Sequence, residues 1–239
     1  MRDENLAATL MVEDRDHKEF KLEIWYDEFS YNPREDDNVA TMVSWDKRVE
    51  FDKYVEDSID FMVSLLHSLG DKTVEAKEYS RNERARLLNL LYQRDDIALL
   101  GIELYDHSGY ALGEYNNNGF PDRMWDVSFV GLIYVTKDKA FNEYGGLTED
   151  NWKAKALDHL RGELNNQDLY VRGDCYGYTQ YEKHHQKVET RKWIDGAEEP
   201  VIEEHEEDYW EDIDSCGGYL LENPKDIVNE LGFTIKEEA

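Results

Sequence analysis

The spacing of apolar residues changes along this chain, from every second residue to every third or fourth and back again. This change restricts the possible folds more than any other feature of the sequence. Residues 20–27 alternate apolar and polar side chains, which is typical of a strand with one buried face. Residues 55–69 instead repeat apolar side chains at helical spacing, and Gly70 then stands where a helix commonly stops. The sequence therefore predicts an α+β fold.

Reading the same signals along the whole chain predicts a mixed or antiparallel sheet with four to five helices and a C-terminal β-meander. The expected strands cover residues 5–12, 20–27, 39–45, 97–105, 110–115, 128–135, 168–182, 187–194, 199–204 and 213–221. The expected helices cover residues 55–69, 80–92, 137–144, 149–164 and a short segment from Asn223 to Gly232. Asp195-Gly196 is a pair typical of a two-residue hairpin turn. No linker rich in Ser, Gly or Pro divides the chain, so we expect a single domain over residues 1–239.

The amino-acid composition of the chain restricts the kinds of partner that it can bind. Hydrophobic residues make up 40% and aromatic residues 13% of the chain, which is typical of a folded core and not of a disordered acidic tail. The 55 Asp and Glu residues outnumber the 27 Lys and Arg residues, and the net charge is −28. This field repels phosphate backbones and anionic membranes, so we expect neither direct nucleic-acid binding nor membrane binding.

The chain shows no sign of export or of a disulfide scaffold. Acidic residues interrupt the N-terminal segment before any signal-like apolar core forms, and no apolar run is long enough to span a membrane. Cys175 and Cys216 are the only cysteines, and each occurs in a C-x-G-Y sequence. Neighbouring carboxylates disfavour a reactive thiolate, so we interpret both as packing residues on adjacent strands. The cytoplasm is the expected compartment.

The strongest local feature is an acidic segment that begins after Trp193. It has eleven carboxylates and no Lys or Arg up to residue 214. One interpretation is a solvated loop; the other is a row of charges that imitates a nucleic-acid backbone or docks on a basic partner. Trp193, Tyr209 and Trp210 interrupt the acids and favour the second interpretation, because they could anchor the segment. The residues proposed to contact a partner are Asp195, Glu198, Glu199, Glu203, Glu204, Glu206, Glu207, Asp208, Glu211, Asp212 and Trp210.

Catalytic and metal-binding patterns are weak. His184, His185 and His205 lie near many acids but have no metal-site spacing, and adjacent residues of a strand point to opposite faces. Asp106-His107-Ser108 contains the residue types of a catalytic triad, but consecutive residues cannot relay a proton in the required order. We therefore expect a protein without enzymatic activity, cofactor or metal. Arg81, Arg84, Arg86 and Arg94 form the only concentrated basic surface, which we interpret as a solvated helix face.

Several motifs together carry a resemblance. They are residues 33–43 (PREDDNVATMV), 104–109 (LYDHSG), 131–135 (GLIYV), 173–178 (GDCYGY) and 214–219 (DSCGGY). In this order they resemble a family of uncharacterised proteins that bacteriophages and conjugative plasmids encode. The chain departs from the family's pattern at Gly217, where an aromatic residue is usual, and at the acidic stretch 183–212, which looks like an insertion. The resemblance implies a mobile-element origin in a bacterial host cell, and no mechanism.

These observations favour a non-enzymatic accessory protein that mimics DNA or blocks the nucleic-acid channel of a host defence protein. The expected partner is a basic nucleic-acid-binding protein of the restriction or CRISPR effector type, since such effectors hold nucleic acid in positively charged channels. Two alternatives remain at this point. One is a metal-dependent enzyme acting on nucleotides or nucleic acid, and the other is a structural or regulatory phage protein whose acidity confers solubility.

Overall fold

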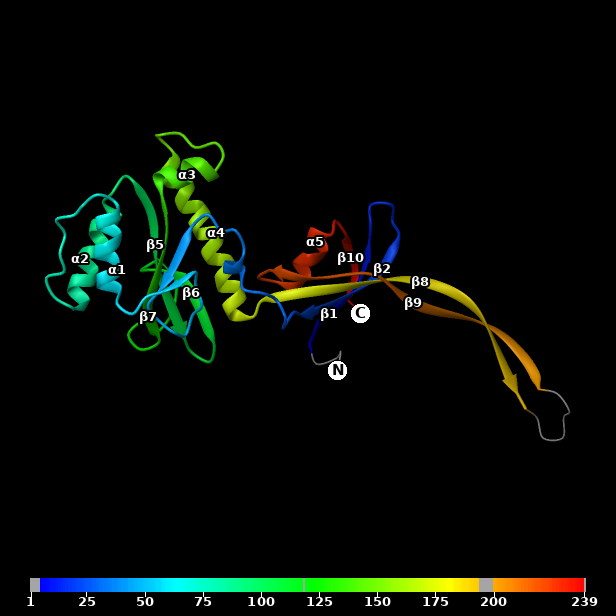
Figure 1. Cartoon of the computed structure of the whole chain (residues 1–239). Helices are drawn as coiled ribbons and strands as arrows, with labels where there is room; N and C mark the ends of the chain where they lie inside the picture. Colours follow the sequence, from blue (N-terminus) through cyan, green and yellow to red (C-terminus); the bar gives the residue numbers. More distant parts are fainter. Residues whose placement is uncertain (1–4, 118, 194–199, 239) are drawn as a thin grey trace. The chain divides into compact units, whose positions relative to one another are not determined.

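The α+β class is confirmed. A computed structural model describes residues 5–117, 119–193 and 200–238, and this part of the chain contains five α-helices and two five-stranded sheets, one antiparallel and one mixed (Figure 1). By its internal contacts the chain divides into two compact units. Unit 1 contains residues 1–30 and 173–239, and unit 2 contains residues 31–172. The single domain expected over residues 1–239 stays a prediction.

Unit 1 is built on an antiparallel sheet in which both ends of the chain take part. Its strands are β1 (Leu6–Glu13), β2 (Glu19–Tyr26), β8 (Cys175–Lys192), β9 (Val201–Leu220) and β10 (Thr234–Glu238), in the order β10-β1-β2-β8-β9. Alternation in β2 buries Phe20, Leu22 and Ile24 on one face. The 3-10 helix η3 (Pro224–Asp226) and the short helix α5 (Ile227–Glu230) follow β9, and Ile227 and Val228 complete this core.

Unit 2 is built on the mixed sheet. Its strands are β3 (Thr41–Ser44), β4 (Lys53–Tyr54), β5 (Ile97–Asp106), β6 (Tyr110–Glu114) and β7 (Val127–Thr136), in the order β4-β3-β7-β5-β6. Only β3 and β4 run parallel. Helices cover both faces of the sheet, so the central strand β5 is apolar along most of its length and buried from Ile97 to Leu104.

The two helical layers of unit 2 contact alternate residues of β5. Helices α1 (Ser58–Ser68) and α2 (Arg81–Tyr92) pack against Ile97 and Leu99 on one face. Helices α3 (Lys137–Glu143) and α4 (Trp152–Arg172) pack against Ala98 and Leu100 on the other. Half of the expected capping box of α2 is present: the Ser80 hydroxyl accepts a hydrogen bond from the Glu83 backbone N–H, whereas the Glu83 carboxylate accepts from the Lys77 backbone N–H and from Arg86.

The structure differs from the sequence-based prediction after residue 164. Helix α4 continues to Arg172, through residues expected to start a strand, because its buried stripe extends through Leu164 and Leu169. Gly173 then adopts a left-handed conformation with φ of 79°, and the strand begins only at Cys175. The four strands expected in the last third are two long ones, β8 and β9, which pair as one antiparallel hairpin.

Candidate functional site

The β8–β9 hairpin is longer than the sheet that supports it. The last residue of β8 paired with β2 is Glu182, opposite Phe20. Beyond this point, residues 183–192 of β8 pair only with residues 201–210 of β9 and form a two-stranded ribbon (Figure 1), and Glu211 and Asp212 lie at its base, opposite Glu182 and Tyr181. We call these residues the arm. They coincide with the described part of the acidic stretch 183–212, so the charge-rich segment forms an ordered strand pair and not a loop.

Cross-strand pairing assigns the acidic side chains of the arm to two faces. Because residues that pair directly point to the same face, Glu207 lies beside Gln186 on one face and Glu206 lies beside Lys187 on the other. The Glu207 face carries Val201, Glu203, His205, Glu207, Tyr209 and Glu211 of β9. The Glu206 face carries Ile202, Glu204, Glu206, Asp208, Trp210 and Asp212. Every one of these side chains is exposed except Trp210, which is half-buried.

In the sequence, no basic residue interrupts the acids of β9. In the structure, lysines of the neighbouring strand β8 lie beside these acids. Strand β8 brings Lys183 Nζ to 2.7 Å from Asp208 Oδ2, and Lys192 Nζ to 2.5 Å from Glu203 Oε2. The hydrogen bond from Lys183, followed by that from His185, lowers the pKa of Asp208 below its ordinary value. Lysines of β8 therefore neutralise part of the negative charge of the arm. The surface of the arm is less negative than the sequence of β9 alone indicates.

Only one of the three aromatic residues expected to anchor the segment lies against the sheet. Trp210 sits at the base of the arm, where Lys21 Nζ lies 5.7 Å from its ring centroid and 4.1 Å from that of Tyr181. Tyr209 stacks on His184 within the arm, with ring centroids 5.6 Å apart. Trp193, at the far end of β8, is 72% exposed. The arm is thus fixed at its base and open to solvent along the rest of its length.

Three of the proposed contact residues lie outside the described part of the chain. They are Asp195, Glu198 and Glu199, and the expected Asp195-Gly196 turn falls in the same stretch. The other eight residues all lie on β9, within twelve positions of one another. The described candidate site therefore consists of Glu203, Glu204, Glu206, Glu207, Asp208, Trp210, Glu211 and Asp212.

The two C-x-G-Y sequences lie side by side and hold one tryptophan. Strands β8 and β9 place Tyr178 opposite Cys216, and the rings of Tyr178 and Tyr219 are 5.9 Å apart. A Cβ atom on Gly177 would lie 2.3 Å from the ring of Trp25, and one on Gly217 would lie 3.3 Å from it. The expected close approach therefore exists at Gly177, where it involves the ring of Trp25 and not another backbone. For Gly217 the nearest atom is Asp27 Oδ2, at 2.6 Å from such a Cβ, and Gly218, the glycine of the second C-x-G-Y, has no atom within 4 Å.

The two cysteines differ in their surroundings. Cys175 is buried, and this burial raises the pKa of its thiol above its ordinary value. Cys216 is exposed, and both cysteines are free thiols. The geometry fits the packing interpretation for Cys175, whereas Cys216 contributes little buried surface.

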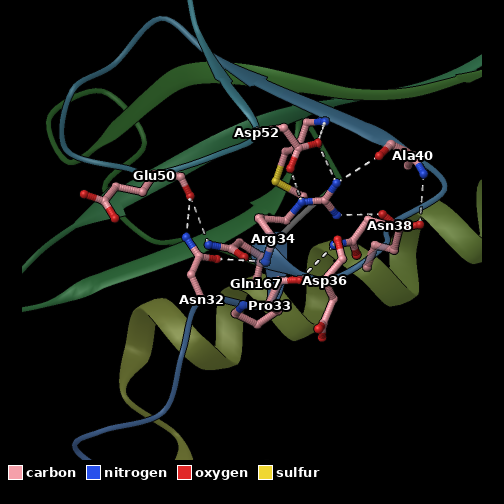
Figure 2. A network of polar contacts seen from close by, with 11 residues as sticks. Asn32, Pro33, Arg34, Asp36, Asn38, Ala40, Glu50, Asp52 and Gln167 are labelled. Carbon is pink, nitrogen blue, oxygen red and sulfur yellow. Dashed lines mark hydrogen bonds and ion pairs between the residues drawn. The ribbon is translucent and has the colours of Figure 1, made fainter.

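The motif at residues 33–43 encloses a buried arginine (Figure 2). The Arg34 side chain is 2% exposed, and its guanidinium donates to both carboxylate oxygens of Asp52 at 2.7 Å and to Glu163 Oε2 at 2.6 Å. Burial alone would lower the Arg34 pKa, but the two carboxylates raise it above its ordinary value. Further bonds join Ala40 O to the guanidinium and Met42 N–H to Asp52. The motif thus ties a loop to the start of β3 and to α4, which is a structural role.

The triad-like residues at 106–108 do not form a relay. Asp106 accepts from Arg48 at 2.7 Å, whereas His107 Nδ1 lies 3.0 Å from Asp126 Oδ2. Ser108 occupies the turn between β5 and β6 with φ of 61°. Asp106 and His107 therefore contact different residues, Arg48 and Asp126, and Ser108 lies in the turn itself.

The histidines near the acids are likewise dispersed. His184 and His185 lie on opposite faces of the arm, as their adjacency in a strand predicts, and His205 pairs across from Val188. Within residues 5–117, 119–193 and 200–238, no three His, Cys, Asp or Glu side chains are grouped so that they could hold a metal ion. In the same residues, no helix combines the length and apolar character needed to cross a membrane.

Comparison with protein-family models, with curated proteins and with solved structures finds no match to this chain.

Proposed function

We propose that this protein is a non-enzymatic inhibitor that inserts its acidic arm into the nucleic-acid channel of a basic host protein. The partner class is a nucleic-acid-binding defence protein of the restriction or CRISPR effector type. The proposal includes a mobile-element origin and action in the cytoplasm of a bacterial host cell. The observation that carries it is the extension of β8 and β9 past β2 as a two-stranded ribbon with exposed carboxylates.

The dimensions of the arm support insertion into a channel. An antiparallel strand advances about 3.4 Å per residue. Glu203 to Asp212 therefore cover about 30 Å, a length comparable to one turn of duplex. A two-stranded β-ribbon is also narrow enough to enter the major groove, so a channel that admits a duplex admits this arm.

The marginal stability of an isolated ribbon also supports a binding role. Two-stranded hairpins are at best marginally stable in water, and this arm has no layer packed on either face among the described residues. A basic partner that contacts the carboxylates would supply the missing interactions.

One specific observation favours a different role for the acidity. Strand β9 is the edge of its sheet, and charged side chains on a long exposed edge prevent pairing with other chains. On this second candidate, the acids keep the arm soluble and contact no channel.

Competition with nucleic acid distinguishes the two roles. The test mixes the whole protein with a purified effector of the restriction or CRISPR type and measures displacement of fluorescently labelled target DNA by anisotropy. We expect displacement that rises with protein concentration and is reversed by excess unlabelled DNA. Simultaneous binding of the protein and DNA to every effector tested would contradict channel insertion.

A further inference from the structure

Unit 2 contains a cavity of about 660 Å³ that lies between α2 and the sheet. Its walls come from the first half of α2, from β5 and β7, and from the segment that joins β6 to β7. This volume falls within the range of small-molecule sites, about 300–1,000 Å³. The cavity is independent of the arm, because all its lining residues belong to unit 2.

Arg81 and Arg84 line this cavity, although the first turns of a helix disfavour positive charge. The sequence suggested a solvated basic face for this helix, but two other arginines of that set are half-buried and paired with acids. Arg86 pairs with Glu83, and Arg94 pairs with Asp96, each at 2.5 Å. Arg81 and Arg84 make no ion pair with the residues that the structure describes, and the buried Nε of Arg84 has no hydrogen-bond acceptor there. Helix stability therefore does not explain these two arginines.

A third arginine of the cavity is fixed in place by a buried acid. Arg123 Nη2 donates to Glu103 Oε1 at 2.5 Å and to Oε2 at 2.7 Å, and Glu103 is 4% exposed. This bond offsets the charge of Arg123 and holds its side chain at the wall of the cavity. Two positive charges, those of Arg81 and Arg84, then remain for a ligand.

The cavity lining also includes aromatic and apolar side chains. Tyr115 and Phe129 have ring centroids 4.7 Å apart, and Leu88 and Val127 lie in the same lining. Met124, at the rim, is 88% exposed. A lining that combines two uncompensated cations with aromatic rings fits a dianion with a planar body.

We propose that this cavity binds a small organic phosphate monoester with a planar ring, the chemistry of a nucleoside monophosphate. The phosphate lies between Arg81 and Arg84, because guanidinium groups bind phosphate oxygens in bidentate geometry. The ring lies against Tyr115 and Phe129, since bases stack on aromatic side chains. The proposal involves binding and no chemical step.

Calorimetric titration of the whole protein with AMP and UMP, in about 0.1 M salt, tests the site. Ribose 5-phosphate and inorganic phosphate are the matched ligands, since they keep the phosphate and lack the ring. We expect saturable binding of at least one nucleotide, about tenfold or more tighter than either ligand without a ring, because stacking contributes about 1–3 kcal/mol per base. Equal affinity for inorganic phosphate, or no saturable nucleotide binding at millimolar concentration, would overturn the proposal.

Substitutions locate the binding within the molecule. Arg81→Gln removes an exposed side chain, so the fold should tolerate it, and Arg84→Gln removes the guanidinium that lacks an acceptor. Each should raise the nucleotide Kd about tenfold or more, because a hydrogen bond to a charged group contributes about 1.5–3 kcal/mol. Arg161→Gln removes the same charge from α4, where Arg161 pairs with Glu114 outside the cavity, and should leave the Kd unchanged. Unchanged affinity in both cavity variants would place the nucleotide elsewhere and refute the assignment.

Discussion

The ammonium group of Lys183 lies 2.7 Å from a carboxylate oxygen of Asp208, across the two strands of the arm. These residues are separated by 25 positions in the sequence, yet the pairing of β8 with β9 makes them neighbours. The same pairing places Lys187 opposite Glu206. It also places two acids, Glu189 and Glu204, directly opposite each other. The electrostatics of the arm therefore depend on cross-strand pairs as well as on total charge.

Replacing one of the two opposed acids should raise the stability of the arm and lower its affinity for a basic partner. Glu204→Lys replaces a repulsive pair with an attractive one, so we expect the arm to gain about 0.2–1 kcal/mol. Hydrogen exchange of the arm amides should slow, while affinity for a basic partner falls. Glu207→Lys, which faces Gln186, is the control, because it changes the same charge without removing a like-charge pair. Faster exchange in Glu204→Lys than in the wild type would contradict the pairing.

Arg34 should be essential to the stability of unit 2. Replacement by Met leaves Asp52 and Glu163 without their shared cation, and breaking a buried ion pair costs about 3–5 kcal/mol. Arg34→Lys should also destabilise, because an ammonium cannot reproduce the two parallel bonds to Asp52. Urea unfolding measures both, with the exposed Arg15→Gln as a control that should lie within about 0.5 kcal/mol of the wild type. Similar midpoints for Arg34→Met and the control would show that the network contributes little.

The contact between Trp25 and Gly177 makes a prediction about unit 1. Gly177→Ala forces a Cβ atom to within 2.3 Å of the indole ring, which should cost about 1–3 kcal/mol. In a Trp25→Ala background this cost should disappear, and a double-mutant cycle measures the coupling. Gly162→Ala, in the interior of α4 with no neighbouring atoms, should instead stabilise by about 0.5–1 kcal/mol. Additive effects at Gly177 and Trp25 would rule out the contact.

Glu83 should make the stability of unit 2 depend on acid pH. Hydrogen bonds from Arg86, and then from the Lys77 backbone N–H, lower the pKa of Glu83 from its ordinary value of 4.5 to about 2. A lowered carboxyl pKa contributes stability that is complete above pH 4.5 and is lost as the pH falls towards 2. The difference in unfolding free energy between the wild type and Glu83→Gln should therefore shrink over this interval. A difference that stays constant down to pH 2 would contradict the assigned pKa.

The elements predicted from the sequence are those whose signals are local. The alternation in residues 20–27 and the N-cap residue Ser80 define β2 and the start of α2, because neither signal depends on distant parts of the chain. The predicted end of α4 was wrong because tertiary packing overrides the local signal. Residues 168–171 include Leu169, Tyr170 and Val171, whose strand-like character is overridden when Leu169 packs into a buried stripe.

The parts of the candidate site that sequence could not predict depend on long-range contacts. The acids of β9 are identifiable from composition, but their basic neighbours on β8 follow only from the strand register. Arg34 looks like an ordinary charged loop residue until Asp52 and Glu163 surround it. For Arg81 and Arg84, the available signal was their position in the first turns of α2, where a positive charge needs another explanation.

The central claim is that the carboxylates of the arm make the contact with a basic partner. Its most direct test compares two variants with the same total charge. The first reverses Glu203, Glu204, Glu206 and Glu207 to Lys on the arm. The second reverses Asp37, Asp95, Glu143 and Asp150, four exposed acids of unit 2, to Lys. Exposed charges contribute little to stability, so both variants should remain folded.

The measurement is the Kd for the DNA-binding partner as a function of salt concentration. We predict that the arm variant binds about tenfold or more weakly and loses most of the salt dependence, whereas the unit 2 variant stays within about twofold of the wild type. Complementary charges act over about 8 Å at physiological ionic strength, so only acids near the contact should matter. Equal weakening by both variants would show that the arm is not the contact and that only the overall charge matters. Unchanged, salt-insensitive binding by the arm variant would contradict the claim altogether.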